Sequence, residues 1–409
     1  MIVESPLFQP LSAGVRRGIE ELLPVIDRTF PLKRRFSSAL PKNISRLSAL
    51  LTKERSELDG SYMSDPALFN AYLRCFLPWN VFRLSRLLPA LRLEAAGGME
   101  IIDLGSGPLT LPVAVWIALP ELRRAPLRFH CVDRNGSALE AGAKLFRALS
   151  VESALSFKSG EKSGWRIKTY RAALGERLKL PPAALVCAVN VSNELFQKLP
   201  QAGTAALAVN AKKFAGSLAG IAADSGRILV VEPGAPRPAQ FLSLLRAAFL
   251  EGGLSVEAPC PSSRACAMSG GRRGQKWCHF NIDVDDAPPL LRKLSAAAAL
   301  PKDKVTLSFL LVSKKALPEK NAPGLLDVRV ISDAFSLPGG MRGRYACCER
   351  GLALLSGGGA VEKYGQGSLL RLQIPEKTVR DAKSGALVID LPAERESPPK
   401  PGLPGSRSF

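Results

Sequence analysis

The sequence contains no run of about 18 uninterrupted apolar residues, so we expect no membrane-spanning helix. Residues 1–14 carry an early acid and two prolines, but neither a basic n-region nor a continuous apolar segment, which argues against a secretory signal. We also find no internal repeat. These absences predict a cytoplasmic protein with no membrane partner, and we expect it to be a monomer.

Acidic residues are scarce relative to basic ones: 36 Asp and Glu stand against 56 Lys and Arg, a formal charge of +20. Such an excess favours binding to polyanions through counterion release, and RNA is the obvious class of partner. The alternative is a charge that only keeps the protein dispersed. The candidate phosphate contacts are Lys33, Arg34, Arg35, Arg272, Arg273, Lys276, Arg342 and Arg344.

With 409 residues, 46% of them hydrophobic, the chain is long enough for two or three domains. Apolar residues at helical spacing predict a helical region over 1–95, with Arg74, Arg83, Arg86 and Arg92 exposed. Alternating short apolar runs and helical stretches predict an α/β domain with a parallel sheet over 96–317. We expect a cysteine-rich insertion at 253–285, a β-rich module at 318–375 and a largely disordered tail at 376–409.

Six strands are expected in the α/β domain, at 100–104, 127–133, 166–170, 184–191, 226–232 and 305–313. The first ends in Asp103 and leads into a helix through a turn that contains Gly105, Ser106 and Gly107. Glycines let the backbone approach a ligand at the amino end of a helix. The second strand ends in Asp133, whose carboxylate can accept hydrogen bonds from both hydroxyls of a ribose. The combination predicts a nucleotide-type cofactor.

A nicotinamide-binding turn would require G-x-G-x-x-G, but Thr110 stands at the third glycine position. The stretch Asp-Leu-Gly-Ser-Gly instead resembles motif I of class I methyltransferases, which implies a doubly wound Rossmann-like sheet that binds S-adenosylmethionine. Leu109 replaces the usual third glycine of this motif, where its side chain would crowd the cofactor. Asn190, at the end of the fourth strand, completes the predicted cofactor-binding set.

No acid or base stands out as catalytic, and no Asn-Pro-Pro-Tyr motif follows Asn190. Cys187 lies inside an apolar strand and is expected to be a core residue, as are Cys75 and Cys131. Methyl transfer by positioning alone stays possible, because the methyl donor is already activated.

Five further cysteines follow the fourth strand: Cys260, Cys266, Cys278, Cys347 and Cys348. Four thiolates satisfy either tetrahedral zinc or a four-cysteine iron-sulfur cluster. No short Cys-x-x-Cys run is present, so spacing alone favours zinc, with His279 as a possible fourth ligand. The alternative is a set of unrelated buried or free thiols.

In order, the motifs DLGSGP, SNEL, VVEPGAP, APC-x5-C, WCHF and KDKVTLSFLLVSK resemble the methyltransferase-like family associated with the small ribosomal subunit. Mitochondrial members of this family act in small-subunit assembly and carry a four-cysteine [4Fe-4S] cluster. The resemblance covers about 60–350. It implies cluster ligands at Cys260, Cys266, Cys278 and either Cys347, which we prefer, or Cys348.

The resemblance therefore implies a basic assembly factor that binds 16S-type ribosomal RNA of the small subunit and carries a [4Fe-4S] cluster. The alternative is a catalytically active S-adenosylmethionine-dependent rRNA methyltransferase with a structural zinc site. A third possibility is a non-catalytic RNA-binding platform that kept the fold and lost turnover. The fold does not decide among them.

Overall fold

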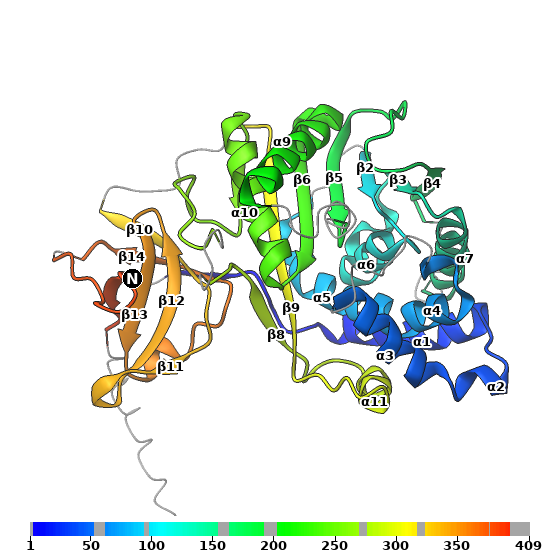
Figure 1. Cartoon of the computed structure of the whole chain (residues 1–409), viewed down its shortest axis with the longest axis horizontal. Coiled ribbons are helices and arrows are strands. Elements are labelled where there is room, and N and C mark those ends of the chain that lie inside the picture. Colours follow the sequence, from blue (N-terminus) through cyan, green and yellow to red (C-terminus); the bar gives the residue numbers. More distant parts are fainter. Residues whose placement is uncertain are drawn as a thin grey trace, which may run out of the picture.

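The computed structural model describes residues 3–52, 62–93, 98–153, 163–191, 203–269, 276–316, 324–375 and 377–392. Two β-sheets organise this part of the chain, and they lie side by side in Figure 1. The larger sheet carries helices on both faces. The smaller sheet lies beyond β8, at the other end of the molecule from β4.

The larger sheet has the order β4-β3-β2-β5-β6-β9-β7, with β8 paired to β9. Neighbours from β4 to β6 are parallel, whereas β9 is antiparallel to β6, β7 and β8. Strand β9 thus lies between β6 and β7 and is antiparallel to both. This is the strand order of class I methyltransferases. The predicted fold class is confirmed. The strands are β2 (Met99–Leu104), β3 (Leu127–Asp133), β4 (Arg166–Arg171), β5 (Ala183–Val189), β6 (Ala222–Pro233), β7 (Ser255–Ala258), β8 (Phe280–Asp283) and β9 (Lys304–Ser313).

All six strands predicted from the sequence are present, with ends shifted by a few residues. The buried parallel strands β2, β3 and β5 were recognisable because such strands read as nearly continuous apolar runs. β7 and β8 lie within 253–285, the range expected to form an insertion. That range therefore contributes two strands to the larger sheet. Residues 259–279, which we call the cysteine segment, connect them.

Helices cover the two faces of the larger sheet with separate apolar cores. One core joins β2, β3 and β5 to α6 (Thr110–Ala118), α7 (Gly136–Ser153) and the N-terminal helices. The other joins β5 and β6 to α9 (Thr204–Ile221) and α10 (Pro236–Glu251). All nine residues of α6 are buried, so its uniformly apolar sequence fits a position between the sheet and the N-terminal helices. Cys75, Cys131 and Cys187 are buried core residues, as expected.

The N-terminal region packs its helices on this first core. These are α1 (Ala13–Thr29), α2 (Arg34–Ser37), α3 (Leu40–Thr52), α4 (Pro66–Ala71), α5 (Leu77–Leu87) and the short helical segments η2 (Tyr62–Ser64), η3 (Tyr72–Phe76) and η4 (Leu88–Leu91). Its arginines were expected to be exposed, and for Arg74 this is wrong. Arg74 is buried and its guanidinium contacts Asp27 and Asn70. Arg83 and Arg86 are half-buried, whereas Arg92 is exposed.

The smaller sheet has the order β1-β14-β10-β12-β13-β15, with β11 paired to β12. β1 (Val3–Pro6) comes from the N-terminal region expected to be helical, and it adds antiparallel to β14 (Ser368–Gln373). β15 (Leu387–Asp390) lies within the tail expected to be disordered and pairs parallel with β13 (Gly351–Gly357). The other strands are β10 (Leu325–Val330), β11 (Phe335–Ser336) and β12 (Arg342–Cys348).

A nine-residue helix, α11 (Pro289–Ala297), connects β8 to β9 and packs near α3. Among the helices of the described ranges, none is both long enough and apolar enough to cross a membrane.

Candidate functional site

The turn after β2 adopts a backbone that favours glycine at two positions. Gly105 and Gly107 have φ of +67° and +51°, in the left-handed region. A Cβ at Gly105 would lie 2.5 Å from Val191 Cγ2, so no side chain fits there. A Cβ at Gly107 would meet no atom within 4 Å, so this backbone faces open space. The turn therefore offers the close approach that a cofactor requires.

Asp103 lies directly below this turn and is almost fully buried. The Ser106 hydroxyl donates a hydrogen bond to its carboxylate. Burial raises the pKa of Asp103 to about 7, with the Ser106 bond opposing the shift and the nearby Asp133 carboxylate adding to it. Asp103 and Ser106 thus support the turn from within.

Asp133 at the end of β3 holds the turn from the other side. Its Oδ2 accepts a hydrogen bond of 2.8 Å from the Gly107 amide, and its Oδ1 accepts one of 2.8 Å from the Asn135 amide. Each carboxylate oxygen keeps a second lone pair, so ribose hydroxyls could still donate to Asp133. The structure brings Asp103, the glycine turn and Asp133 together.

The side chain of Leu109 does not crowd this turn. Leu109 has a left-handed backbone at the start of α6, with φ of +57°, and its side chain is fully buried in the core. There it faces Gly142 of α7: a Cβ added at Gly142 would lie 2.7 Å from Leu109 Cδ1. Leu109 is absent from the lining of the cavity at the turn, so it gives no reason to doubt cofactor binding.

A cavity of about 50 Å³ opens at the turn, and we call it the cofactor cavity. Of the predicted residues, Gly105, Gly107, Asp133 and Asn190 line it. Sequence reasoning missed the other lining residues, and three of these, Tyr62, Met63 and Tyr72, come from the N-terminal region. Burial raises the pKa of Tyr72, although the nearby polar side chains of Thr110 and Asn80 oppose the shift. The aromatic stretch at 62–72 is the sequence signal for these lining residues, but by itself it indicates only packing.

Asn190 follows β5 with a left-handed backbone, φ of +59°, and its amide donates to the Val231 carbonyl at 2.7 Å. The next amide, of Val191, donates to Oε1 of the buried Glu232 at 3.0 Å. These bonds fix the end of β5 against the end of β6 beside the cofactor cavity. The SNEL motif at 192–195 lies outside the described residues.

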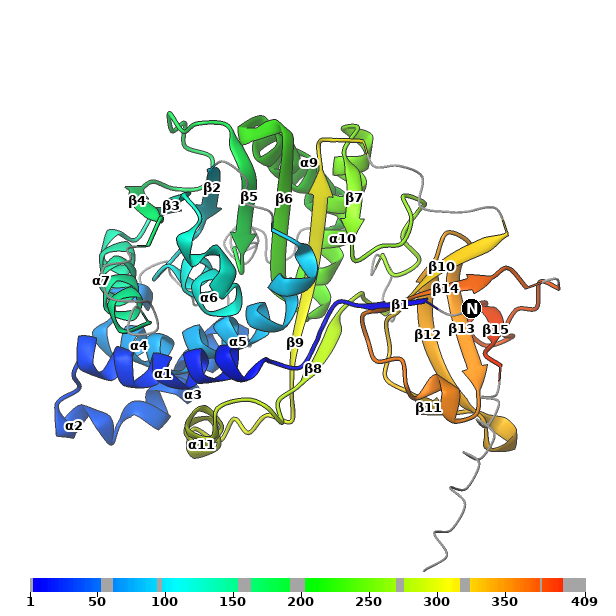
Figure 2. The same ribbon diagram turned by 180° about the vertical axis from the view of Figure 1, so that it is seen from behind.

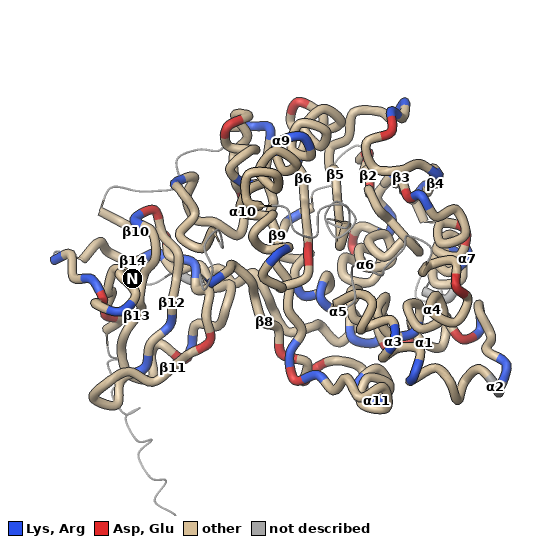
Figure 3. Tube along the Cα trace, in the orientation of Figure 1, with Lys and Arg blue, Asp and Glu red and all other residues tan. Residues whose placement is uncertain are grey.

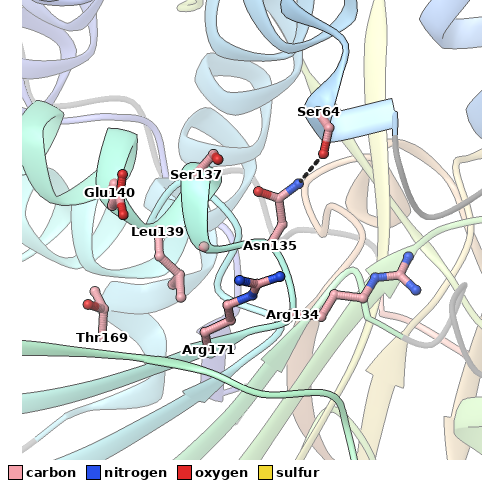
Figure 4. A pocket seen from close by; sticks show the side chains of 9 residues that line it. Ser64, Arg134, Asn135, Ser137, Leu139, Glu140, Thr169 and Arg171 are labelled. Carbon is pink, nitrogen blue, oxygen red and sulfur yellow. Dashed lines mark hydrogen bonds between the residues drawn. The ribbon is translucent and has the colours of Figure 1, made fainter.

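A second and larger cavity, of about 570 Å³, adjoins the first, with which it shares Arg134 and Asn135. We call it the arginine pocket (Figure 4). Arg134 and Arg171 line it from the ends of β3 and β4, and Asn135 donates to the Ser64 hydroxyl at 3.2 Å. Its other lining residues are Gly136, Ser137, Leu139, Glu140 and Thr169.

The cysteine segment is anchored to α10 and β9. The Arg246 guanidinium of α10 donates to the carbonyls of Ser262 and Arg264 at 2.7 and 2.9 Å. The Ser308 hydroxyl of β9 donates to the Cys278 carbonyl at 2.8 Å. The Ser243 hydroxyl of α10 lies 3.5 Å from Sγ of Cys266, near the middle of the cysteine segment. These bonds order both sides of the segment around 270–275, which lies outside the described residues.

The four cysteines named as cluster ligands converge on this region. Burial raises the pKa of Cys347 well above its usual range, and the nearby thiols of Cys278, Cys260 and Cys266 raise it further. Cys348 points the other way, into the core of the smaller sheet. His279, the alternative zinc ligand, stacks on Trp277.

The proximity of these cysteines does not by itself make a metal site. Within the described ranges, no group of three or more His, Cys, Asp or Glu side chains lies close enough to hold a metal ion. The structure thus brings the cysteines together without showing a metal site.

One of the predicted phosphate contacts, Arg344, is wrong, and a second, Arg342, lies in an exposed ion pair. Arg344 is buried and its guanidinium donates to the carbonyls of Val361, Ser332 and Glu362. Arg342 pairs with Glu362 at 2.7 Å. The Lys276 ammonium lies 4.9 Å from the ring centre of Tyr345. Arg272, Arg273 and the side chains of Arg34 and Arg35 fall outside the described residues, and Lys33 is exposed.

Residues 138–334 match the model of a family described as mitochondrial small ribosomal subunit Rsm22. The match confirms the resemblance found in the sequence. It includes Cys260, Cys266 and Cys278, but it begins after the glycine turn and ends before Cys347. The sequence has no match among curated proteins.

Several solved structures of methyltransferases are similar to the chain. A class I S-adenosylmethionine-dependent methyltransferase from Listeria monocytogenes, described as putative, is 13% identical, with 76% of this chain and 91% of that chain covered and a TM-score of 0.36. A methyltransferase from Pyrococcus furiosus is 9% identical, with 55% and 80% covered and a TM-score of 0.31. These scores are low, so the fold assignment rests on the strand order.

Proposed function

We propose that this chain, a relative of the methyltransferase-like family associated with the small ribosomal subunit, binds S-adenosylmethionine at the glycine turn and 16S-type ribosomal RNA during subunit maturation. The observation that carries the proposal is the joining of Asp103, the glycine turn and Asp133 around the cofactor cavity, in a chain that matches this family. The charge of +20 supports an RNA partner.

The cofactor would enter the cofactor cavity with its ribose on Asp133 and would extend past Asn135 toward the arginine pocket. At about 50 Å³ the cofactor cavity alone is smaller than the several hundred Å³ usual for such ligands. The adjoining arginine pocket, of about 570 Å³, supplies the missing volume. Bound cofactor would supply an activated methyl group, while the residues of the chain hold and orient it.

We further propose that Cys260, Cys266, Cys278 and Cys347 hold a [4Fe-4S] cluster, with zinc as the alternative. The convergence of these four thiols and the match to the family support this proposal. A metal would replace the thiol protons, and burial together with neighbouring thiols raises the pKa of Cys260, Cys278 and Cys347. Within the described residues no three of these side chains lie close enough to hold a metal, so binding would require them to move closer together. The family description names mitochondria, so the cytoplasmic location stays a prediction.

Methyl transfer to the RNA is the second candidate function. The intact turn and the harmless position of Leu109 favour it over a platform that has lost its cofactor. Incubation of purified small-subunit RNA with the protein and methyl-labelled cofactor distinguishes the two: stable label in the RNA supports transfer.

Calorimetric titration with S-adenosylmethionine tests the cofactor proposal. We expect Gly107→Val to abolish binding, because the side chain would fill the open space at the turn and strain a left-handed backbone. Asp133→Ala should weaken binding at least about tenfold, because it unpairs the ribose and releases the turn.

Gly216→Val on α9 is the matched control, because a Cβ at that position also meets no atom within 4 Å but lies far from the turn in sequence. The control should bind like the wild type. Absence of binding to the wild type at millimolar cofactor would refute the proposal.

A further inference from the structure

Within the residues that the structure describes, one end of the larger sheet has no helical cover on one face. The face that packs on α9 and α10 is covered mainly over β5, β6, β7 and β9. The crossover from β4 to β5, residues 172–182, contains no helix. β4 is the edge strand of the described sheet, and both views place it far from α10 (Figures 1 and 2).

The uncovered face carries basic and aromatic side chains. On β4, Arg166, Lys168 and Tyr170 alternate with residues that face α7, and both Arg166 and Lys168 are exposed. On β3, Arg128 lies beside Arg166 and His130 beside Lys168 in the register. We call these five residues the β3–β4 face. Figure 3 shows basic segments at this edge of the sheet.

The carboxylate of Glu100, on β2 beside the β3–β4 face, interacts with Arg128 and His130. Glu100 of β2 accepts a hydrogen bond from Arg128, and its Oε2 lies 2.7 Å from His130 Nε2. Burial opposes the shift, but these bonds lower the pKa of Glu100. His130 also lies 3.0 Å from the Tyr170 hydroxyl through its Nδ1. Arg166 and Lys168 are therefore left as the exposed cations that the edge strand presents on this face.

The spacing of these groups matches a nucleic acid strand. Alternate residues of a β-strand lie about 7 Å apart, close to the separation of successive phosphates in an extended single strand. Arg166 and Lys168 would each contact one phosphate, and the next residue on this face is the half-buried Tyr170, whose ring stacks on His130 with centres 5.7 Å apart. Aromatic rings on a sheet surface provide stacking platforms for unpaired bases.

We propose that the β3–β4 face binds single-stranded RNA, with phosphates on Arg166 and Lys168 and a base on Tyr170. The inference rests on the proposed function, because it names the surface that such an RNA would use. The strand would run along the sheet edge toward the arginine pocket, where Arg171 faces the other side of β4. We expect double-stranded RNA not to bind in this way, because its stacked base pairs leave no base face accessible to the Tyr170 ring.

The test measures binding of a fluorescent 12-nucleotide oligouridylate to the full chain by anisotropy, from 50 to 300 mM salt. Each phosphate contact on a single strand contributes about 0.7 to the slope of log affinity against log salt. Removing two contacts with Arg166→Gln and Lys168→Gln should flatten the slope by about 1.4. The matched control, Arg292→Gln with Lys293→Gln on α11, removes the same charge from another exposed pair and should keep the slope.

Tyr170 gives a second readout that charge alone would not change. Tyr170→Leu should weaken binding about tenfold with the salt slope unchanged, because stacking releases no counterions. Tyr170→Phe keeps the ring and should bind like the wild type. Thermal unfolding of each variant reports whether it is folded.

Each result decides the inference. If the wild type binds RNA but the Arg166 and Lys168 variant keeps affinity and slope, the inference fails and the proposed function stands. If the wild type ignores both the oligonucleotide and purified small-subunit RNA at low salt, the RNA part of the proposed function fails as well. Equal competition by vesicles of anionic phospholipid would show a general anion surface and overturn the inference.

Discussion

Burial of Asp103 beneath the glycine turn sets the proton affinity of one carboxyl group. Its pKa rises from an ordinary 3.8 to about 7, mainly through desolvation. The folded state therefore holds this proton more tightly than the unfolded chain does, so the contribution of Asp103 to stability falls as pH rises from about 4 to 7. Above pH 7 the penalty is constant.

Asp103→Asn should remove this pH dependence while preserving an acceptor for Ser106. Urea unfolding at pH 4 to 8 is expected to show the variant gaining on the wild type by an amount on the order of 4 kcal/mol between the ends of the range. The same pH dependence in both proteins would show that Asp103 does not titrate in this range.

At the scale of residues, the sequence predicted which residues lie at the cofactor cavity better than it predicted which side chains are exposed to solvent. Gly105, Gly107 and Asp133 could be located because backbone strain and strand ends leave a local pattern. The burial of Arg74 could not, because its partner Asp27 is 47 residues away and only the packing of α1 on the later helices joins them. Leu109 was misread because its left-handed backbone turns the side chain into the core.

The Arg246 side chain of helix α10 supports the cysteine segment between Cys260 and Cys266. Arg246 is buried and donates to two carbonyls of the segment between Cys260 and Cys266. Arg246→Leu should leave both carbonyls unpaired, cost about 2 kcal/mol and displace the proposed cluster ligands. Protein purified without oxygen should then contain far less iron and sulfide than the wild type, as Cys266→Ser should.

Lys212→Met on α9 is the control, because its ion pair with Glu251 is largely exposed and contributes little. It should keep the iron content of the wild type. A wild-type protein that holds one stoichiometric zinc and no sulfide would contradict the iron-sulfur proposal and support the alternative.

Among the elements, strands β2, β3, β5, β6 and β9 were predictable because they are largely buried and apolar. β4 was found from its position between helical stretches, but its exposed face was not foreseen, since the missing helix of the crossover leaves no sequence signal before the topology is known. β15 was missed because four residues flanked by Pro, Gly and Ser resemble a tail until β13 supplies a partner.

For the whole molecule, Arg329 of β10 joins three parts of the chain. Its buried guanidinium donates to the carbonyls of Pro259, Ser5 and Gly367 at 2.9, 3.3 and 2.6 Å. Burial lowers the pKa of Arg329 to about 10, which still leaves the group charged at neutral pH. Arg329→Met should therefore cost about 3 kcal/mol by unpairing these carbonyls.

Calorimetry should show this loss as an earlier unfolding of the smaller sheet, ahead of the larger one. Arg380→Met is the comparison, since Arg380 is exposed and bonds only within its own hairpin, to Gly385. A single unchanged transition for Arg329→Met would mean that the two sheets do not depend on this contact.

The addition of β1 to the smaller sheet sets an order of events during synthesis. Val3 pairs with Arg371, so β1 must wait for β14, which is translated much later, before it can pair. Contacts between such distant residues form slowly, because a long loop must close first. The larger sheet can assemble before β14 is translated, whereas the smaller one cannot be completed until then, and in the meantime its unpaired edges require protection from neighbouring chains.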